Sequence, residues 1–110
     1  MDASKLSCTT VTFGCPVDQA VRAMKQAGFT STELWPRDYY FSNDGPDAVI
    51  NLLRDTGMTI SCYQNLRNYE GMPEAQRATK QRIAEQLFSQ MQLIGAETLV
   101  LCSNIAPDSI

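Results

Sequence analysis

Three glycines divide this chain into repeating units. The sequence reads Ala-Gly-Phe at 27–29, Thr-Gly-Met at 56–58 and Ile-Gly-Ala at 94–96. In each case a helix-like pattern precedes the glycine and an apolar, strand-like run follows it. Glycine often ends a helix because it readily adopts the left-handed backbone conformation that other residues avoid. The three junctions therefore predict a β-α-β-α-β-α-β series.

The segments between these glycines show two kinds of apolar pattern. Strand-like runs that contain apolar residues predict four strands, at 6–13, 31–35, 59–63 and 98–102. Apolar residues at three- and four-residue spacing predict three helices, at 17–27, 46–56 and 74–94. Parallel neighbours in a sheet need a long connection, which a helix provides. This order therefore predicts the α/β class, with parallel β/α units.

Length and charge narrow the kind of protein further. A chain of 110 residues has the size of one domain or part of one, so we expect residues 1–110 to form a single unit. The net charge of −3 is spread over interspersed acidic and basic residues, which argues against nucleic acid or an anionic membrane as a partner. The sequence has no run as long as a membrane span and no apolar N-terminal segment of the signal-peptide type, so we expect a cytoplasmic location.

The cysteine and histidine content limits the chemistry. The four cysteines, Cys8, Cys15, Cys62 and Cys102, do not have the spacing of zinc or thioredoxin motifs, and we expect them to be reduced core or lining residues. The chain has no histidine, so it lacks the commonest metal ligand and the usual general base at neutral pH. Glycine-rich phosphate-binding motifs are also missing from the sequence.

Polar residues gather where the predicted strands end. Parallel α/β enzymes place their chemistry after the carboxyl ends of the strands, and the long polar connections of this chain follow those ends. The candidate substrate-binding residues are Glu33, Gln64, Arg67, Tyr69 and Asn104.

The charged candidates also have structural interpretations. Glu33 interrupts an apolar strand, so it either faces a polar cavity, forms a salt bridge with Arg37 or Arg67, or lies exposed at a strand edge. Arg67 either grips a ligand carboxylate through its planar guanidinium group or pairs with Glu70 in a solvated loop.

The neutral candidates leave the same choice open. Gln64 and Asn104 either offer hydrogen bonds to a polyol or cap the backbone at strand ends. Aromatic side chains after the second predicted strand either wall a pocket or pack a loop; they are Trp35, Tyr39, Tyr40 and Phe41.

Two motifs resemble those of a known superfamily. The run AGFTSTEL at 27–34 resembles the "AGF-x-x-x-E-hydrophobic" second strand of the sugar phosphate isomerase/epimerase superfamily, the xylose-isomerase-like TIM barrels. The stretch YQNLRNYEG at 63–71 resembles the "Q-P-F-R-D-F/Y-E-G" loop of 3-dehydroshikimate dehydratases within that superfamily, with Asn65 where the family often has proline. Residues 101–104 resemble their fourth strand and 38–40 the segment after their second, so the matches cover nearly the whole chain.

The resemblance implies a (β/α)₈ barrel of which this chain is the N-terminal half. It also implies a divalent metal, magnesium or manganese, in the full-length parent, held by later strands and not by this chain. The dehydratases are lyases (hydro-lyases) that convert 3-dehydroshikimate to protocatechuate in aromatic and quinate catabolism. By this comparison Arg67 holds the substrate carboxylate and Glu33, Gln64 and Tyr69 line the same mouth, while the catalytic residues are expected beyond residue 110.

Half of a barrel leaves surfaces uncovered. A closed barrel needs eight β/α units, and this chain is expected to supply four strands and three helices. Two sheet edges and one apolar sheet face would remain open, which predicts either a truncated chain or a half barrel that self-associates through its edges. The isolated chain is expected to have little or no dehydratase activity. Two alternatives stay open: a fragment of a sugar or sugar phosphate isomerase or epimerase, and a non-enzymatic, self-associating α/β module that binds a small carboxylic acid or sugar.

Overall fold

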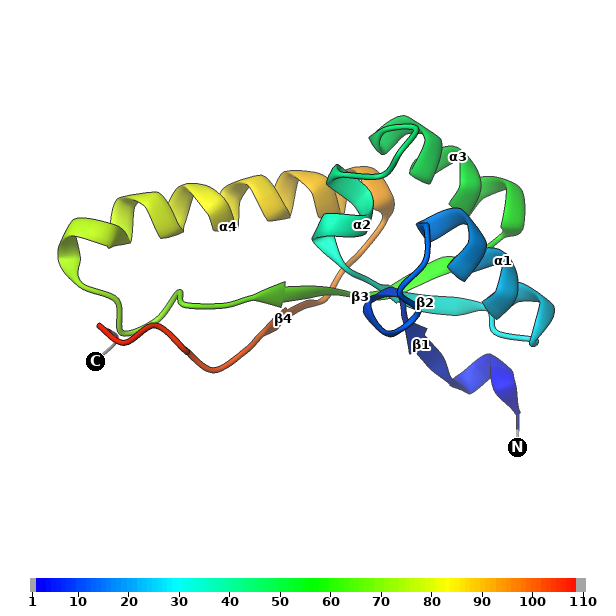
Figure 1. Cartoon of the computed structure of the whole chain (residues 1–110), viewed down its shortest axis with the longest axis horizontal. Coiled ribbons are helices and arrows are strands. Elements are labelled where there is room, and N and C mark those ends of the chain that lie inside the picture. Colours follow the sequence, from blue (N-terminus) through cyan, green and yellow to red (C-terminus); the bar gives the residue numbers. More distant parts are fainter. Residues whose placement is uncertain (1, 109–110) are drawn as a thin grey trace.

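The computed structural model describes residues 2–108 and contains one parallel sheet with helices on one side (Figure 1). The sheet has four strands in the order β1-β2-β3-β4, and each strand is parallel to its neighbour. Their bounds are Ser7–Thr9 for β1, Ser31–Leu34 for β2, Thr59–Leu66 for β3 and Leu99–Leu101 for β4. The predicted α/β class and parallel pairing are confirmed.

The main helices connect successive strands. They are α1 at Val17–Gln26, α2 at Pro36–Tyr40, α3 at Pro46–Thr56 and α4 at Glu74–Ile94, with short 3₁₀ turns η1 at Ala3–Lys5 and η2 at Thr10–Thr12. The bounds predicted for α3 and α4 match the structure, and α1 ends one residue earlier than predicted. The short helix α2 was not predicted, because it occupies a single turn after Pro36 and has no apolar periodicity to reveal it. No helix in residues 2–108 is long and apolar enough to cross a bilayer.

Two of the three glycines end their helices as predicted. Gly57 and Gly95 are the C-caps of α3 and α4, with φ of 66° and 74° in the left-handed region. Gly28 lies one residue beyond the C-cap of α1 and also has a positive φ, of 95°. Each helix therefore ends where the backbone must turn back into the sheet.

Strands β1 and β3 differ from the prediction. The first strand was predicted to run over 6–13, but it ends at Thr9. Thr9 is the N-cap of η2, because its side-chain oxygen accepts a hydrogen bond from the Val11 amide. The third strand continues three residues further than predicted, to Leu66, because its end pairs with β4. Gln64 therefore lies within a strand rather than after one.

The face of the sheet toward the helices forms the core. Thr32, Leu34, Ile60 and Tyr63 are buried on this face, against apolar residues of α1, α3 and α4. Tyr63 donates a hydrogen bond to Gln90 Oε1 of α4 at 2.5 Å, and burial raises the pKa of its hydroxyl. The tyrosine thereby ties the sheet to its longest helix and remains neutral while doing so.

The opposite face of the sheet is polar, so the expectation of an uncovered apolar face is wrong. Ser7 and Thr9 of β1 are register partners of Ser31 and Glu33 of β2, and Ser31 and Glu33 alternate with the buried Thr32 and Leu34. Ser7 Oγ lies 2.7 Å from Ser61 Oγ of β3. Because side chains alternate between the two faces of a strand, Ser31 and Glu33 lie on the side without helices, while Thr32 and Leu34 lie on the buried side.

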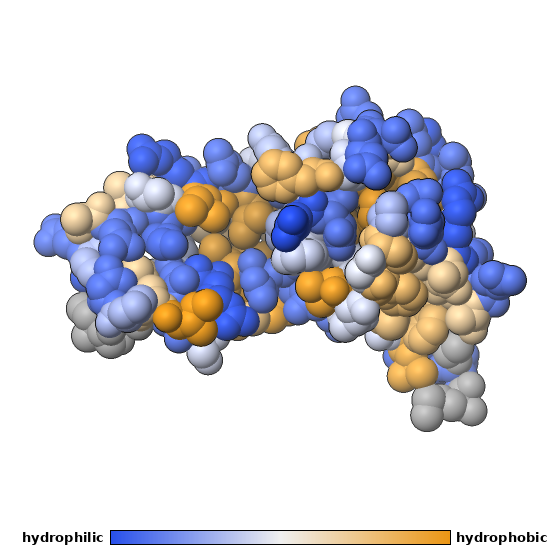
Figure 2. Space-filling model, in the orientation of Figure 1, coloured by the Kyte–Doolittle hydropathy of each residue, from blue (hydrophilic) through white to orange (hydrophobic). Residues whose placement is uncertain are grey.

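Apolar residues are nevertheless exposed elsewhere on the surface. Figure 2 shows hydrophobic residues among the hydrophilic ones over α4 and over the segment after β4. The large exposed side chains there are Phe88, Leu93, Leu101 and Ile105. Exposed apolar residues therefore lie on the helical layer and next to the β4 edge, and Leu6, Val11 and Phe13 are also exposed on either side of β1.

We predict that Leu34→Ala lowers the free energy of unfolding by about 2–5 kcal/mol, because the Leu34 side chain is 0% exposed and its removal leaves a cavity against the helices. Leu93→Ala is the matched control: Leu93 is 64% exposed, so its loss should change the free energy of unfolding by less than about 0.5 kcal/mol. Urea denaturation followed by circular dichroism measures both values. Equal effects of the two substitutions would contradict the assignment of the core.

Candidate functional site

A hydrogen-bonded group of three side chains marks the open face of the sheet. Gln64 Nε2 of β3 donates to Glu33 Oε2 of β2 at 2.7 Å and to Thr9 Oγ1 of β1 at 2.8 Å. All three side chains are half-buried. We call Thr9, Glu33 and Gln64 the polar triad. It joins three neighbouring strands near their carboxyl ends, where parallel α/β proteins usually bind ligands.

The register of the strands brings the polar triad together. Thr9 and Glu33 are direct partners in the β1–β2 pairing. Between β2 and β3 the register shifts at Thr32/Glu33, so that Glu33 pairs with Cys62 instead of Ser61. Gln64 lies two residues after Cys62 in β3, so this irregularity places Gln64 on the same face of the sheet as Glu33.

Glu33 therefore bonds to an amide rather than to an arginine. The salt bridges expected with Arg37 or Arg67 are not formed; the guanidinium of Arg37 lies over the Trp35 ring instead, 5.4 Å from its centroid. Glu33 lies half-buried on the face of the sheet without helices, and its role in a polar cavity stays a prediction.

Cys62 lies beside the carboxylate of Glu33. Its thiol is buried, at 9% exposure, and burial together with the negative charge of Glu33 raises its pKa. The thiol is therefore protonated at neutral pH, in agreement with the expected role as a reduced lining residue. All four cysteines are free in the structure.

Arg67 and Tyr69 lie beyond the end of β3, away from the polar triad's hydrogen bonds. Arg67 is half-buried and has no hydrogen-bond or ion-pair partner within residues 2–108, so the expected pair with Glu70 is not formed. Tyr69 is partly exposed and lines a small hollow with Arg77 and Lys80 at the start of α4. The structure thus brings two of the five predicted site residues into contact and leaves the guanidinium of Arg67 available.

Asn104 binds the backbone of the loop after β3. Its Nδ2 donates to the carbonyl oxygen of Glu70, while its Oδ1 is buried without a partner in the described part of the chain. Asn68, which the sequence reasoning missed, accepts hydrogen bonds from the amides of Ile105 and Ala106 at 2.8 and 3.0 Å. These two asparagines hold the loop after β3 beside the segment after β4 (Figure 1).

The residue type of Asn68 was the one feature of the sequence that could have indicated its role in the loop. It has a φ of 57°, and asparagine tolerates this left-handed conformation better than most residues do. For Asn104, the backbone-bonding alternative describes what the structure contains.

The aromatic residues after β2 do not form one wall. Tyr39 is buried in the core and meets Tyr63 edge-to-face, with ring centroids 6.4 Å apart. Tyr40 and Phe41 are exposed, and their ring centroids lie 5.3 Å apart. The loop-packing alternative therefore holds for these residues.

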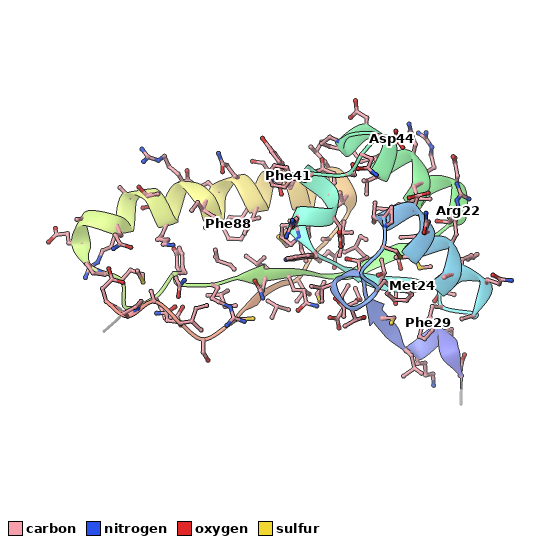
Figure 3. The ribbon with its side chains drawn as sticks, in the orientation of Figure 1. Arg22, Met24, Phe29, Phe41, Asp44 and Phe88 are labelled. Atoms are coloured by element: carbon pink, nitrogen blue, oxygen red, sulfur yellow. The ribbon has the colours of Figure 1, made fainter. Side chains whose placement is uncertain are left out.

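A separate cavity of about 540 Å³ lies among α1, α3 and the loop between α2 and α3. Figure 3 shows Arg22 on α1 and Asp44 and Phe41 on that loop, all part of its lining. It lies in the helical layer, on the other side of the sheet from the polar triad. Sequence reasoning missed it because its lining comes from three segments, none of which has a motif.

The donor set for a metal is incomplete in this part of the chain. Within residues 2–108 no three side chains of His, Cys, Asp or Glu gather closely enough to hold a metal ion. On the open face Glu33 and Gln64 supply one carboxylate and one amide oxygen, which can be only part of an oxygen-rich site.

Comparisons with known proteins place this geometry in context. The chain is 29% identical over 104 residues to a 3-dehydroshikimate dehydratase of Pseudomonas aeruginosa and 27% identical to one of Pseudomonas putida, in each case over 94% of this chain. The chain is homologous to these dehydratases. It spans only 16% of the length of either relative. No protein-family model matches the chain.

Solved structures agree on the fold. A xylose isomerase-like TIM barrel/4-hydroxyphenylpyruvate dioxygenase fusion protein superposes with a TM-score of 0.86 and 27% identity, covering 94% of this chain and 17% of the fusion. The probable 3-DHS dehydratase of Bacillus anthracis gives a TM-score of 0.69 and 19% identity, covering 88% of this chain and 37% of that one. The predicted superfamily resemblance is confirmed, and the fold is the one found within xylose-isomerase-like TIM barrels.

We predict that Cys62 reacts with iodoacetamide more slowly than Cys15 at pH 8, because its raised pKa lowers the thiolate fraction and its burial limits access. Glu33→Gln removes the nearby negative charge, which should lower the Cys62 pKa and speed its alkylation. Cys15, which lies before α1, should react at an unchanged rate and serves as the internal control. Mass spectrometry of the individual peptides measures both rates, and a Cys62 rate that does not respond to Glu33→Gln would contradict this arrangement.

Proposed function

We propose that this chain is the N-terminal half, with the first four strands and the helices that connect them, of a metal-dependent enzyme of the 3-dehydroshikimate dehydratase type. The observation that carries the proposal is the homology to two 3-dehydroshikimate dehydratases over 94% of the chain. The polar triad supports it, because it offers a carboxylate and an amide on the open face of the sheet, where a hydroxylated substrate can bind. The reaction is the loss of water from 3-dehydroshikimate to give protocatechuate, which classes the enzyme as a lyase of aromatic or quinate catabolism.

In this proposal the residues of the chain bind and orient the substrate. Arg67, half-buried and without an ion-pair partner in the described residues, binds the substrate carboxylate through its planar guanidinium group. Glu33 and Gln64 bind the ring hydroxyls, and Tyr69 and Asn104 lie at the rim of the same mouth. A magnesium or manganese ion held by the rest of the enzyme would supply a Lewis acid for the substrate ketone.

The direct test uses the native gene product, expressed from its source organism's gene, with 3-dehydroshikimate and magnesium or manganese. Formation of protocatechuate is followed by its ultraviolet absorbance. We expect turnover by the wild type and, in Arg67→Ala, a KM raised about 10- to 100-fold, the range for losing a hydrogen bond to a charged group. Arg82→Ala on the exposed surface of α4 is the control and should leave KM unchanged. Turnover of ketoses but not of 3-dehydroshikimate would shift the assignment to a sugar isomerase or epimerase.

The isolated 110-residue chain should show little or no dehydratase activity in the same assay, because the catalytic residues and the metal site are assigned to the rest of the barrel. Robust turnover by the purified chain as a monomer would overturn this part of the proposal.

We also propose that the isolated chain self-associates through its sheet edges. β1 and β4 are both edge strands, and exposed Leu6 precedes β1 while exposed Leu101 and Ile105 end or follow β4. An open edge and nearby apolar side chains favour pairing with another strand. Sedimentation velocity over a range of concentrations should show a dimer or larger species that Leu101→Lys weakens. A monomer at all concentrations would contradict self-association.

A further inference from the structure

The side-chain amide of Gln64 uses both of its hydrogens within the polar triad. Nε2 donates to Glu33 Oε2 at 2.7 Å and to Thr9 Oγ1 at 2.8 Å, and an amide NH₂ has two hydrogens to donate. A carboxylate only accepts, so the group that faces Glu33 must be the NH₂ and not the amide oxygen. The orientation of the amide therefore follows from the chemistry of its neighbours.

Two oxygens of the triad are left without a partner. Gln64 Oε1 and Glu33 Oε1 accept no hydrogen bond from any residue in the range 2–108. Neither belongs to the buried polar atoms that lack a partner, so both reach solvent on the open face. They are hydrogen-bond acceptors on residues whose side chains are already in contact.

Thr9 is fixed in place by its own local structure. It is the last residue of β1 and the N-cap of η2, where its Oγ1 accepts a second hydrogen bond from the Val11 amide at 3.4 Å. As a β-branched residue in a strand it has few rotamers to choose from. Its hydroxyl is therefore a fixed acceptor for the Gln64 amide hydrogen that does not bind Glu33.

We propose that Thr9 is a positioning residue for ligand binding. With Glu33 it holds the Gln64 amide in one orientation, so that Gln64 Oε1 and Glu33 Oε1 together accept hydrogen bonds from the two hydroxyls of a vicinal diol. Without Thr9, one amide hydrogen loses its acceptor and only the contact with Glu33 restrains the amide, so the acceptor pair is less well preformed. This inference rests on the proposed function, since it assigns the diol of a hydroxylated cyclohexene carboxylate to the triad.

The test compares two ligands that a dehydratase cannot turn over. Shikimate carries the carboxylate and the ring hydroxyls, and cyclohex-1-ene-1-carboxylate carries the carboxylate alone. Isothermal titration calorimetry of the native gene product gives the dissociation constant of each. We expect Thr9→Val to weaken shikimate binding about 3- to 10-fold, the range for one neutral hydrogen bond, and to leave binding of the diol-free acid unchanged.

Two further variants separate positioning from a structural role. Thr9→Ser keeps the hydroxyl and should restore the shikimate dissociation constant to within about 2-fold of the wild type. Thr59→Val is the matched control, because it removes a threonine hydroxyl that bonds the Thr30 carbonyl at 3.2 Å at the other end of the same sheet. It should leave the binding of both ligands unchanged.

The outcomes distinguish this inference from the proposed function. A wild type that binds shikimate no better than the diol-free acid, or a Thr9→Val variant that weakens both ligands equally, would overturn the positioning role. Failure to turn over 3-dehydroshikimate, with the shikimate selectivity and its loss in Thr9→Val intact, would overturn the proposed reaction but not the role of Thr9.

Discussion

The structure depends on strand β2, which is the point where the core and the candidate site meet. Its burial alternates residue by residue: Thr32 and Leu34 are fully buried toward the helices, while Ser31 and Glu33 face the open side. The buried Thr32 hydroxyl donates to the Cys8 carbonyl at 2.7 Å, which fixes β1 against β2. A shift of one residue in this register would place Glu33 in the core and Leu34 on the open face, so the packing of the core also sets the position of the carboxylate.

The sequence predicted the fold well because its signals there are local. Gly57 and Gly95 end their helices at the expected residues, and the bounds of α3 and α4 match, since apolar periodicity and a left-handed glycine are both properties of a short segment. The ends of β1 and β3 were predicted less well. Whether β1 stops at Thr9 depends on a side-chain cap, and whether β3 continues to Leu66 depends on pairing with β4, more than 30 residues later.

The site was only partly predictable for the same physical reason. Residue type and position identified Glu33 and Gln64 as ligand-facing candidates, and the structure joins them. Thr9 could not be found from the sequence, because its role depends on a register shift in β2–β3 pairing that brings Gln64 within reach. The polarity of the open face was also misjudged, although the alternation of serine, threonine and glutamate in β1 and β2 carried that information.

The loop after β3 and the segment after β4 also hold each other in place. Asn68 accepts hydrogen bonds from two backbone amides of the segment after β4, and Asn104 donates one to a backbone carbonyl of the loop after β3. Each asparagine side chain therefore binds the backbone of the other segment. Arg67 lies immediately before Asn68, which means that the conformation of its backbone is restrained by these bonds while its guanidinium has no partner in the described residues. A long, flexible cation on a restrained backbone loses less freedom on binding a carboxylate than one on a mobile loop. In the proposed function, the asparagine pair would assist carboxylate binding by restraining the backbone next to Arg67, without either asparagine touching the ligand.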